Sequence, residues 1–244
     1  MRPVASRSCN GRKRSPTTLL RRLRRAEGVE QRMRIAAELL VGSPYLSNPL
    51  IGGPAEPERL ILGLDAFDCV TFVETVLALA RSGSEAKFRL ELRRTRYRAG
   101  CVGWRTRLHY FSEWLQANQR RGAVRLRTAG PGARIIQARL AILEGLPPRS
   151  VRFPVVPRRS LPLAAARLGA VSIVAFASLR SGLDYFHTGL VVRDFPDQPV
   201  PALTLIHAAR SAGRVVREPL GAFLARNRMR GISFAAPLPA GDSR

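Results

Sequence analysis

Hydrophobic residues recur at helical spacing through the first half of the chain. We expect a helix where apolar and charged residues alternate with this period over 17–40, and further helices over 85–95 and 104–120. The most apolar of the predicted helices begins at Asp68, a favoured N-cap residue, and ends before Gly83. These patterns predict that the first half of the chain is helical.

The second half changes to alternating and continuous apolar runs separated by Pro, Gly and Asp turns. These runs predict strands. They lie at 151–156, 171–177, 185–192, 203–208, 213–217 and 232–235, with a short helix over 220–227. Helices followed by strands are typical of an α+β fold with an antiparallel sheet. We expect one domain over 17–244, preceded by a disordered basic leader over 1–16.

The charge of the chain points to polyanionic partners without identifying one. The net charge is +24, almost all of it from arginine. Such a charge attracts nucleic acid, anionic lipid or an acidic polymer. The basic residues are spread over most segments, and no zinc-finger spacing or phosphate-binding glycine loop is present, so we expect no dedicated nucleic-acid site. No apolar run approaches the roughly 18–20 residues of a membrane span, so we expect no transmembrane segment.

Cys69 is the strongest candidate for chemistry because it lies at the start of the apolar helix. A helix start carries unpaired N–H groups and a partial positive charge, which favour a thiolate. The other two cysteines, Cys9 and Cys101, lie in an arginine-rich leader and a glycine-containing loop, and three cysteines predict no disulfide framework. A buried cysteine is often only a small hydrophobic residue, so Cys69 alone leaves an inert role open.

Two histidines on predicted strands provide a candidate base and its partner. His187 and His207 are equidistant in sequence from Asp197, in the middle of a turn-rich connection. If the strands form a hairpin centred on Asp197, the two imidazoles lie directly opposite each other. A second imidazole can then orient the base. One residue of slip would send His207 to the other face.

Several short motifs follow one another along the chain. They are Gly42-Ser43-Pro44-Tyr45, the stretch 64–74 around Asp68-Cys69, Arg96-Tyr97-Arg98-Ala99-Gly100, Arg107-Leu108-His109-Tyr110-Phe111, Gly182-Leu183-Asp184, His187-Thr188-Gly189-Leu190 and Ile206-His207-Ala208. With these motifs in this order, the chain resembles the NlpC-type papain-like cell-wall hydrolases, and within them the N-acetylmuramoyl-L-alanine amidase branch. The resemblance extends over roughly residues 39–234.

The resemblance implies a role for each of six residues. Cys69 would be the nucleophile, His187 the base and His207 the orienting third member. Tyr45, Arg107 and His109 match positions near the substrate groove; of these, His109 lies off the apolar stripe of its predicted helix and by itself suggests a surface residue. The family fold places a nucleophile-bearing helix against an antiparallel sheet, and it requires no metal or cofactor.

The implied substrate is peptidoglycan or a muropeptide, cleaved at the muramoyl–alanine amide. The γ-D-glutamyl–diamino acid bond is the alternative within the superfamily, and a non-catalytic arginine-rich polyanion-binding module is the alternative outside it. The resemblance implies the periplasm or cell envelope, although the chain shows no apolar core of a secretory signal, which leaves a cytoplasmic location open. Ala170 stands where the family usually has aspartate, which predicts an altered hydrogen-bond pattern there.

Overall fold

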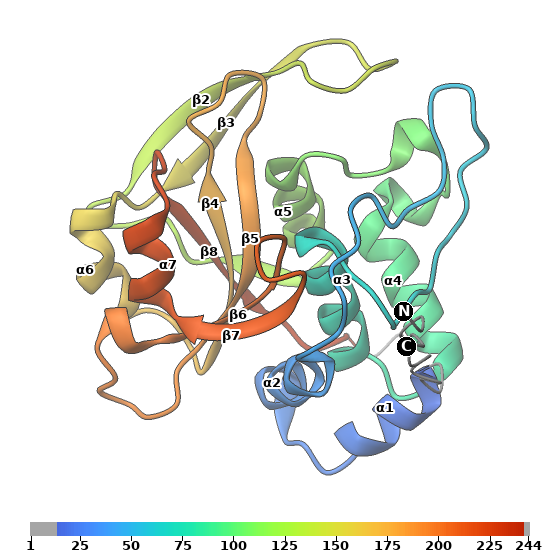
Figure 1. The fold of residues 1–244 in the computed structure, drawn as a ribbon, viewed down its shortest axis with the longest axis horizontal. Coiled ribbons are helices and arrows are strands. Elements are labelled where there is room, and N and C mark those ends of the chain that lie inside the picture. The colour runs from blue at the N-terminus through green and yellow to red at the C-terminus, as the bar shows by residue number, and fades with distance from the viewer. Residues whose placement is uncertain (1–13, 242–244) are drawn as a thin grey trace, which may run out of the picture.

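The computed structural model describes residues 14–241, and the predicted leader lies mostly outside them. Figure 1 shows a helical layer packed against a sheet, with two short helices on the sheet's other side. The helices are α1 (Pro16–Leu23), α2 (Gly28–Leu40), α3 (Cys69–Ala80), α4 (Glu85–Arg96), α5 (Phe111–Arg120), α6 (Leu161–Ala165) and α7 (Leu220–Arg226). No helix of the described residues is long and apolar enough to cross a membrane.

The main sheet has six antiparallel strands in the order β1-β8-β4-β5-β6-β7. Its members are β1 (Val124–Leu126), β4 (Val171–Ala177), β5 (Tyr185–Val192), β6 (Thr204–Ala209), β7 (Arg214–Pro219) and β8 (Ile232–Pro237). A separate hairpin pairs β2 (Arg134–Leu140) with β3 (Arg149–Val155) and extends from the top of the molecule in Figure 1. The predicted α+β class with an antiparallel sheet is therefore confirmed.

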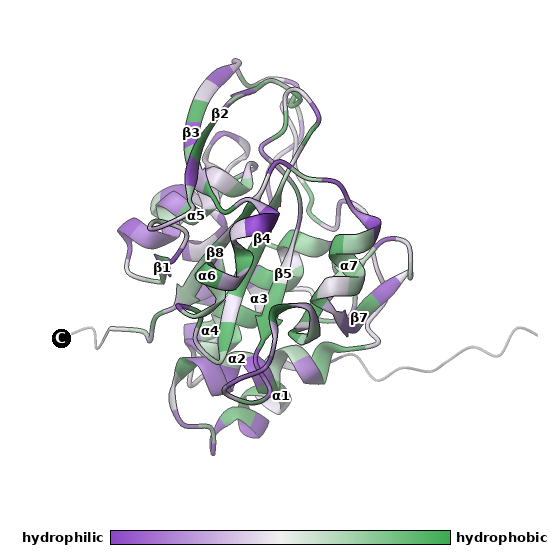
Figure 2. Cartoon of the chain, turned by 90° about the vertical axis from the view of Figure 1, so that its left-hand side faces the viewer, coloured by the Kyte–Doolittle hydropathy of each residue, from purple (hydrophilic) through white to green (hydrophobic). Residues whose placement is uncertain are grey.

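Hydrophobic residues pack against both faces of the main sheet. One core cluster joins α1–α5 to one face, and a second joins α6 and α7 to the other. Every residue of β4 is buried, as expected for a central strand covered on both sides. In Figure 2 the hydrophobic colour is concentrated in α3 and β5 at the centre of the molecule.

Two of the predicted helices were wrong in their extent. The segment 17–40 forms two helices, because the polar Arg24–Glu27 connection interrupts the apolar stripe and Gly28 adopts a left-handed φ of 74°. The segment 104–120 forms an α-helix only from Phe111, and a short 3₁₀ helix at Trp104–Thr106 precedes it. Between the two, Leu108 donates its backbone N–H to the carbonyl of Arg96 at 2.9 Å, which holds this part extended along the end of α4.

Strands β1 and β2 were absent from the sequence prediction. Both are rich in arginine, and β2 has a mostly exposed or half-buried pattern, so neither shows the apolar alternation of a core strand. The other strands lie within two residues of their predicted ends.

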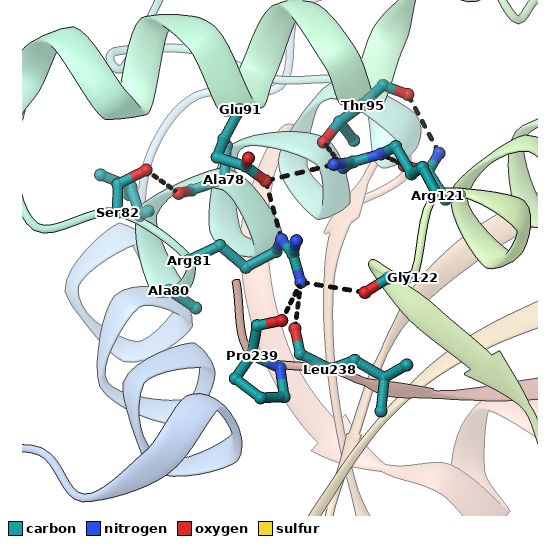
Figure 3. A network of polar contacts seen from close by, with 12 residues as sticks. Ala78, Ala80, Arg81, Ser82, Glu91, Thr95, Arg121, Gly122, Leu238 and Pro239 are labelled. Atoms are coloured by element: carbon teal, nitrogen blue, oxygen red, sulfur yellow. Dashed lines mark hydrogen bonds and ion pairs between the residues drawn. The ribbon is translucent and has the colours of Figure 1, made fainter. Parts of the chain in front are cut away.

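A buried ionic network fixes the far end of α3 to the end of the chain, as Figure 3 shows. Arg81 donates to Glu91 of α4 at 2.7 Å and to the carbonyl of Pro239 at 2.7 Å, and it also contacts the carbonyl of Leu238. Arg121 reaches the same Glu91 carboxylate at 3.2 Å. These contacts tie α3, α4, the end of α5 and the segment after β8 into one unit.

Candidate active site

Cys69 is the first residue of α3, and the helix start around it is well ordered by a capping box. The Asp68 carboxylate accepts the Thr71 backbone N–H at 2.8 Å, and the Thr71 hydroxyl accepts the Asp68 N–H at 3.0 Å. Every residue from Thr71 to Ala80 is buried, so the helix cannot rotate without breaking the core. Cys69 itself is half-buried, and part of it reaches the surface.

The Cys69 thiol is protonated at neutral pH. Burial raises its pKa to about 12, the Asp68 carboxylate adds to the shift, and the backbone N–H groups of Thr188, Cys69 and Val70 oppose it. The sequence predicted that the helix start would favour the thiolate. That expectation was wrong for the resting protein, because desolvation and a neighbouring carboxylate outweigh the partial positive charge of the helix end.

His187 and His207 are hydrogen-bonded to each other. Nε2 of His187 lies 2.6 Å from Nδ1 of His207, and the ring centroids are 4.8 Å apart. Burial, followed by the neighbouring His207, lowers the pKa of His187 to about 3. Burial also lowers the pKa of His207, and Glu218 partly opposes this effect. Both imidazoles are therefore neutral at neutral pH.

The hairpin register differs by two residues from the predicted one. The β5–β6 pairs are Leu190↔Ile206, Val191↔Leu205 and Val192↔Thr204, so the same register places His207 opposite Gly189 and diagonal to His187. A shift of two residues keeps both histidines on the same face. The predicted meeting of the imidazoles is therefore confirmed, although the predicted direct pairing was wrong.

Gly189 makes the diagonal contact possible. A Cβ atom at this position would lie 2.8 Å from Cβ of His207 and 2.9 Å from the carbonyl oxygen of Ile206. Both distances are shorter than an ordinary contact between carbon and its neighbours. Because Gly189 has no side chain, the His207 side chain can approach the strand that carries His187.

Glu218 of β7 extends the pair into a row of four side chains. Its Oε1 lies 2.9 Å from Nε2 of His207, and its Oε2 pairs with Arg226 of α7. Phe223 covers the row, with its ring 5.4 Å from each imidazole centroid. The sequence prediction missed Glu218 because the expected strand 213–217 ended one residue before it.

The Cys69 thiol lies against the backbone of β5, the strand that carries His187. The thiol lies near the N–H of Thr188, the residue after His187. Within residues 14–241 no hydrogen bond joins the thiol to an imidazole ring. His187 and Thr188 both lie beyond Leu190↔Ile206, the last residue pair of the β5–β6 ladder. The structure thus brings His187 and His207 into contact and places Cys69 beside the same strand.

Tyr45 lies close to the start of α3. Its backbone N–H donates to the carbonyl of Gly213 at 2.8 Å, and the following N–H of Leu46 donates to the carbonyl of Phe67 at 2.9 Å. Burial raises the pKa of the Tyr45 phenol, and the nearby Cys69 adds to this shift. Tyr45 is therefore a neighbour of the thiol.

A cavity of about 440 Å³ opens beside the helix start. Asp68 and Val70, on either side of Cys69, line it, together with Trp104, Arg107 and His109, whereas Cys69, His187 and His207 are not part of its lining. The irregular loop 46–65 supplies another wall through Asn48, Pro49, Leu50 and Gly52. The cavity can hold a small polar ligand next to the helix start that carries Cys69.

Arg107 lines this cavity, and contacts with other residues hold its side chain in place. Its guanidinium pairs with Glu58 and donates to the carbonyl of Gly52 at 3.1 Å, and it lies over the Trp104 ring at 4.7 Å. The Tyr97 hydroxyl donates to the same Glu58 carboxylate at 2.7 Å. Arg107 thus fastens loop 46–65 to the helical layer, and its buried Nε has no protein partner.

His109 is half-buried rather than a surface residue of a helix. It precedes α5, stacks edge-on against Trp104 at 4.2 Å and hydrogen-bonds the Trp104 carbonyl through Nε2 at 2.7 Å. Burial lowers its pKa, and the bond to Trp104 partly opposes this. The side chain is a neutral imidazole in the wall of the cavity.

The missing aspartate at Ala170 is offset by a carboxylate from another element. Glu30 of α2 accepts the backbone N–H of Val171 at 3.1 Å. Its carboxylate occupies the space beside Gly169, where a Cβ would lie 2.4 Å from it. The start of β4 therefore has a carboxylate partner despite Ala170. Among the described residues, no group of three or more His, Cys, Asp or Glu side chains is arranged to hold a metal ion.

Solved structures share this fold. An N-acetylmuramoyl-L-alanine amidase from Bacteroides uniformis ATCC 8492 is 24% identical, with 86% of this chain and 99% of that chain covered and a TM-score of 0.71. Protein LPG0564 from Legionella pneumophila strain Philadelphia 1 is 20% identical, with 92% and 94% covered and a TM-score of 0.77. At these identities the similarity establishes the fold. A comparison with curated proteins gave no match.

The sequence also matches a family model described as AmiA-like, N-acetylmuramoyl-L-alanine amidase-like, over residues 35–232. This range includes the capped start of α3, the two bonded histidines, Glu218 and the cavity. The chain belongs to the N-acetylmuramoyl-L-alanine amidase-like family.

Proposed function

We propose that this protein is a cysteine amidase that hydrolyses the N-acetylmuramoyl–L-alanine bond of peptidoglycan fragments. The observation that carries the proposal is the hydrogen bond between His187 of β5 and His207 of β6, together with the contact of Cys69 with Thr188, the residue after His187. Family membership supports an amide substrate. We also propose that the protein works in the periplasm or cell envelope, where such a substrate occurs, and that its fold is of the papain-like NlpC type.

The reaction begins from a neutral thiol and a neutral imidazole. Cys69 attacks the lactyl carbonyl of the muramoyl group while its proton passes to His187, so no isolated thiolate forms in the buried site. His187 then gives the proton to the nitrogen of L-alanine as the C–N bond breaks. The products of this half-reaction are the free peptide amine and a muramoyl thioester on Cys69.

Hydrolysis of the thioester uses the same base. His187 takes a proton from water as the water oxygen attacks the thioester carbonyl, and the thiol leaves with that proton. The backbone N–H of Cys69 points out of the capped helix start and is the candidate donor to the oxyanion in both steps. The released muramic acid carries a free carboxylate, and Cys69 returns to its thiol form.

The cavity provides the candidate substrate groove. Trp104 and His109 form one wall, and Tyr45 lies beside the thiol. Nη2 of Arg107 already holds the 46–65 loop, whereas Nη1 has no hydrogen bond within residues 14–241 and is the candidate donor to a peptide carboxylate. We therefore propose Tyr45, Arg107 and His109 as substrate contacts.

Digestion of defined muropeptides tests the proposal. Purified protein incubated with N-acetylmuramoyl tripeptide should release a peptide with a free L-alanine amine, and the Cys69→Ala variant should release none. Release of the diamino acid instead would move the scissile bond to the γ-D-glutamyl position. Equal release by both proteins would contradict the cysteine mechanism. Salt-sensitive polyanion binding with no cleavage would favour a binding module.

A further inference from the structure

We propose that Glu218 is a positioning residue that sets the tautomer of His187 through His207. The inference rests on the proposed function, because it concerns the nitrogen of His187 that accepts the Cys69 proton. Glu218 acts at a distance of two hydrogen bonds and does not contact the reacting atoms. Its role is to keep the proper nitrogen of the base free.

The donor and the acceptor of each hydrogen bond can be assigned by starting from the Glu218 carboxylate. A carboxylate accepts hydrogen bonds and donates none, and the guanidinium of Arg226 at its other oxygen can only donate. Nε2 of His207, 2.9 Å from Glu218, must therefore carry a hydrogen. A neutral imidazole has one N–H, so Nδ1 of His207 is an acceptor.

The tautomer of His187 follows from that of His207. Nε2 of His187, 2.6 Å from the acceptor Nδ1 of His207, must be the donor in that bond. The single hydrogen of His187 is then on Nε2, and its Nδ1 has a free lone pair. Burial lowers the pKa of His207 and keeps it neutral, so Nδ1 of His207 remains an acceptor at neutral pH. The row thus leaves His187 ready to accept a proton at Nδ1.

Replacing Glu218 with glutamine should reverse the row. Arg226 only donates, so the amide of Glu218→Gln turns its oxygen to Arg226 and its NH₂ group to Nε2 of His207. The hydrogen of His207 then moves to Nδ1, and that of His187 moves to Nδ1 as well. The nitrogen needed for proton transfer is blocked, while the shape of the site is retained.

A second substitution should restore the original row. In the Glu218→Gln/Arg226→Met double variant, nothing holds the amide oxygen away from His207. The amide can rotate, and its oxygen can accept from Nε2 of His207 as the carboxylate does. Arg226→Met alone should keep the native tautomers because Glu218 remains a carboxylate.

The test is a ¹⁵N NMR measurement of ring tautomers at neutral pH on histidine-labelled protein. The chain has three histidines, so His109, His187 and His207 can be assigned by single substitutions. In the wild-type protein we expect Nε2–H on His187 and His207, in Glu218→Gln we expect Nδ1–H on both, and in the double variant we expect the wild-type pattern. This readout needs no substrate, so it stands even if the proposed function fails.

Kinetics with the muropeptide provides the second readout. Converting a carboxylate to an amide directly on a catalytic histidine costs about 10⁴-fold in kcat in the serine-protease triad. Glu218 is separated from His187 by one further imidazole, that of His207. We therefore expect Glu218→Gln to lower kcat by about 10²-fold or more, with KM changed less than about threefold. The double variant should recover at least about tenfold of the loss.

The matched control is Glu38→Gln, which removes a carboxylate paired at 3.2 Å with Arg217, next to Glu218 in sequence but away from the histidines. It should leave tautomers and kcat unchanged. Nδ1–H on His187 in the wild-type protein would overturn the proposal without any variant. It would also be overturned by native tautomers in folded Glu218→Gln, or by reversed tautomers with unchanged kcat.

Discussion

At the scale of single residues, the site is built from groups that burial holds neutral. The Cys69 thiol has a raised pKa and the His187 imidazole a lowered one, and both shifts come first from loss of water. In the proposed mechanism, proton transfer therefore accompanies attack and no ion pair is required beforehand. The diagonal contact through Gly189 and the hydrogen bonds of His207 to His187 and Glu218 fix the position of the His187 imidazole.

The lowered pKa of His187 predicts a dependence of stability on pH. The folded protein takes up a proton at His187 only near pH 3, whereas the unfolded chain does so near pH 6.5. Between these values unfolding binds a proton, so the free energy of unfolding falls as pH falls from 6.5 toward 3. A single such group contributes up to about 1.4 kcal/mol per pH unit, and His207 contributes in the same direction.

Urea unfolding between pH 4.5 and 7.5 measures this slope. The His187→Gln variant should show a flatter dependence than the wild-type protein, whatever its absolute stability. His207→Gln provides a second comparison with the same expected sign. A slope that is unchanged in both variants would show that the histidines titrate alike in the folded and unfolded protein, which contradicts the lowered pKa values.

At the scale of elements, the position of the thiol depends on how α3 is fixed at its two ends. The capping box orders the start, and a buried ion pair between Glu74 and Arg96 at 2.7 Å fastens the middle to α4. The Arg81–Glu91–Arg121 network of Figure 3 fixes the far end. Since β5 and β6 pack against the same helix, displacement of α3 would move Cys69 away from the strand that carries His187.

Removal of Glu91 should therefore be costly. Arg81 and Glu91 have side chains only 4% and 3% exposed, so Glu91→Ala leaves a buried guanidinium without its counterion. Breaking a buried pair in this way costs about 3–5 kcal/mol, which we expect as the loss in free energy of unfolding by urea.

The surface pair of Glu38 and Arg217 provides the comparison for Glu91. These side chains are 32% and 45% exposed, and Glu38→Ala should cost less than about 1 kcal/mol. Equal losses in the two variants would show that the Arg81–Glu91–Arg121 network adds no more to the free energy of unfolding than a solvent-exposed ion pair does.

At the scale of the whole molecule, a large part of the fold follows from local patterns in the sequence. The apolar helix after Asp68 and the continuous run of β4 are predictable because burial on all sides leaves a strong signal. The break before Gly28 has a local cause, the polar connection and the left-handed glycine, which the predicted long helix overlooked. The extended Arg107–Leu108 segment is set by a tertiary contact with Arg96, which periodicity does not contain. The same limit hid Glu218, since its role appears only when β7 pairs with β6.

The candidate site was predictable from the sequence in part. The motifs named Cys69, His187 and His207 as candidates, and alternation placed the two histidines on one face, where the structure brings them into contact. The sequence did not predict the pKa of the thiol, because the balance between helix end, Asp68 and burial depends on the folded environment. Nor did it show that Arg107 is occupied by Glu58, which lies 49 residues away in the chain.

The most direct test of the account is rapid quenching during turnover of N-acetylmuramoyl tripeptide, followed by mass spectrometry of the peptide that contains Cys69. Trypsin cuts at Arg59 and Arg81 and isolates that cysteine from Cys9 and Cys101. The account predicts a thioester of the muramoyl lactyl group on Cys69 in the first milliseconds, lost in Cys69→Ala. Product formation with no adduct on Cys69, or with the adduct on another residue, would contradict it.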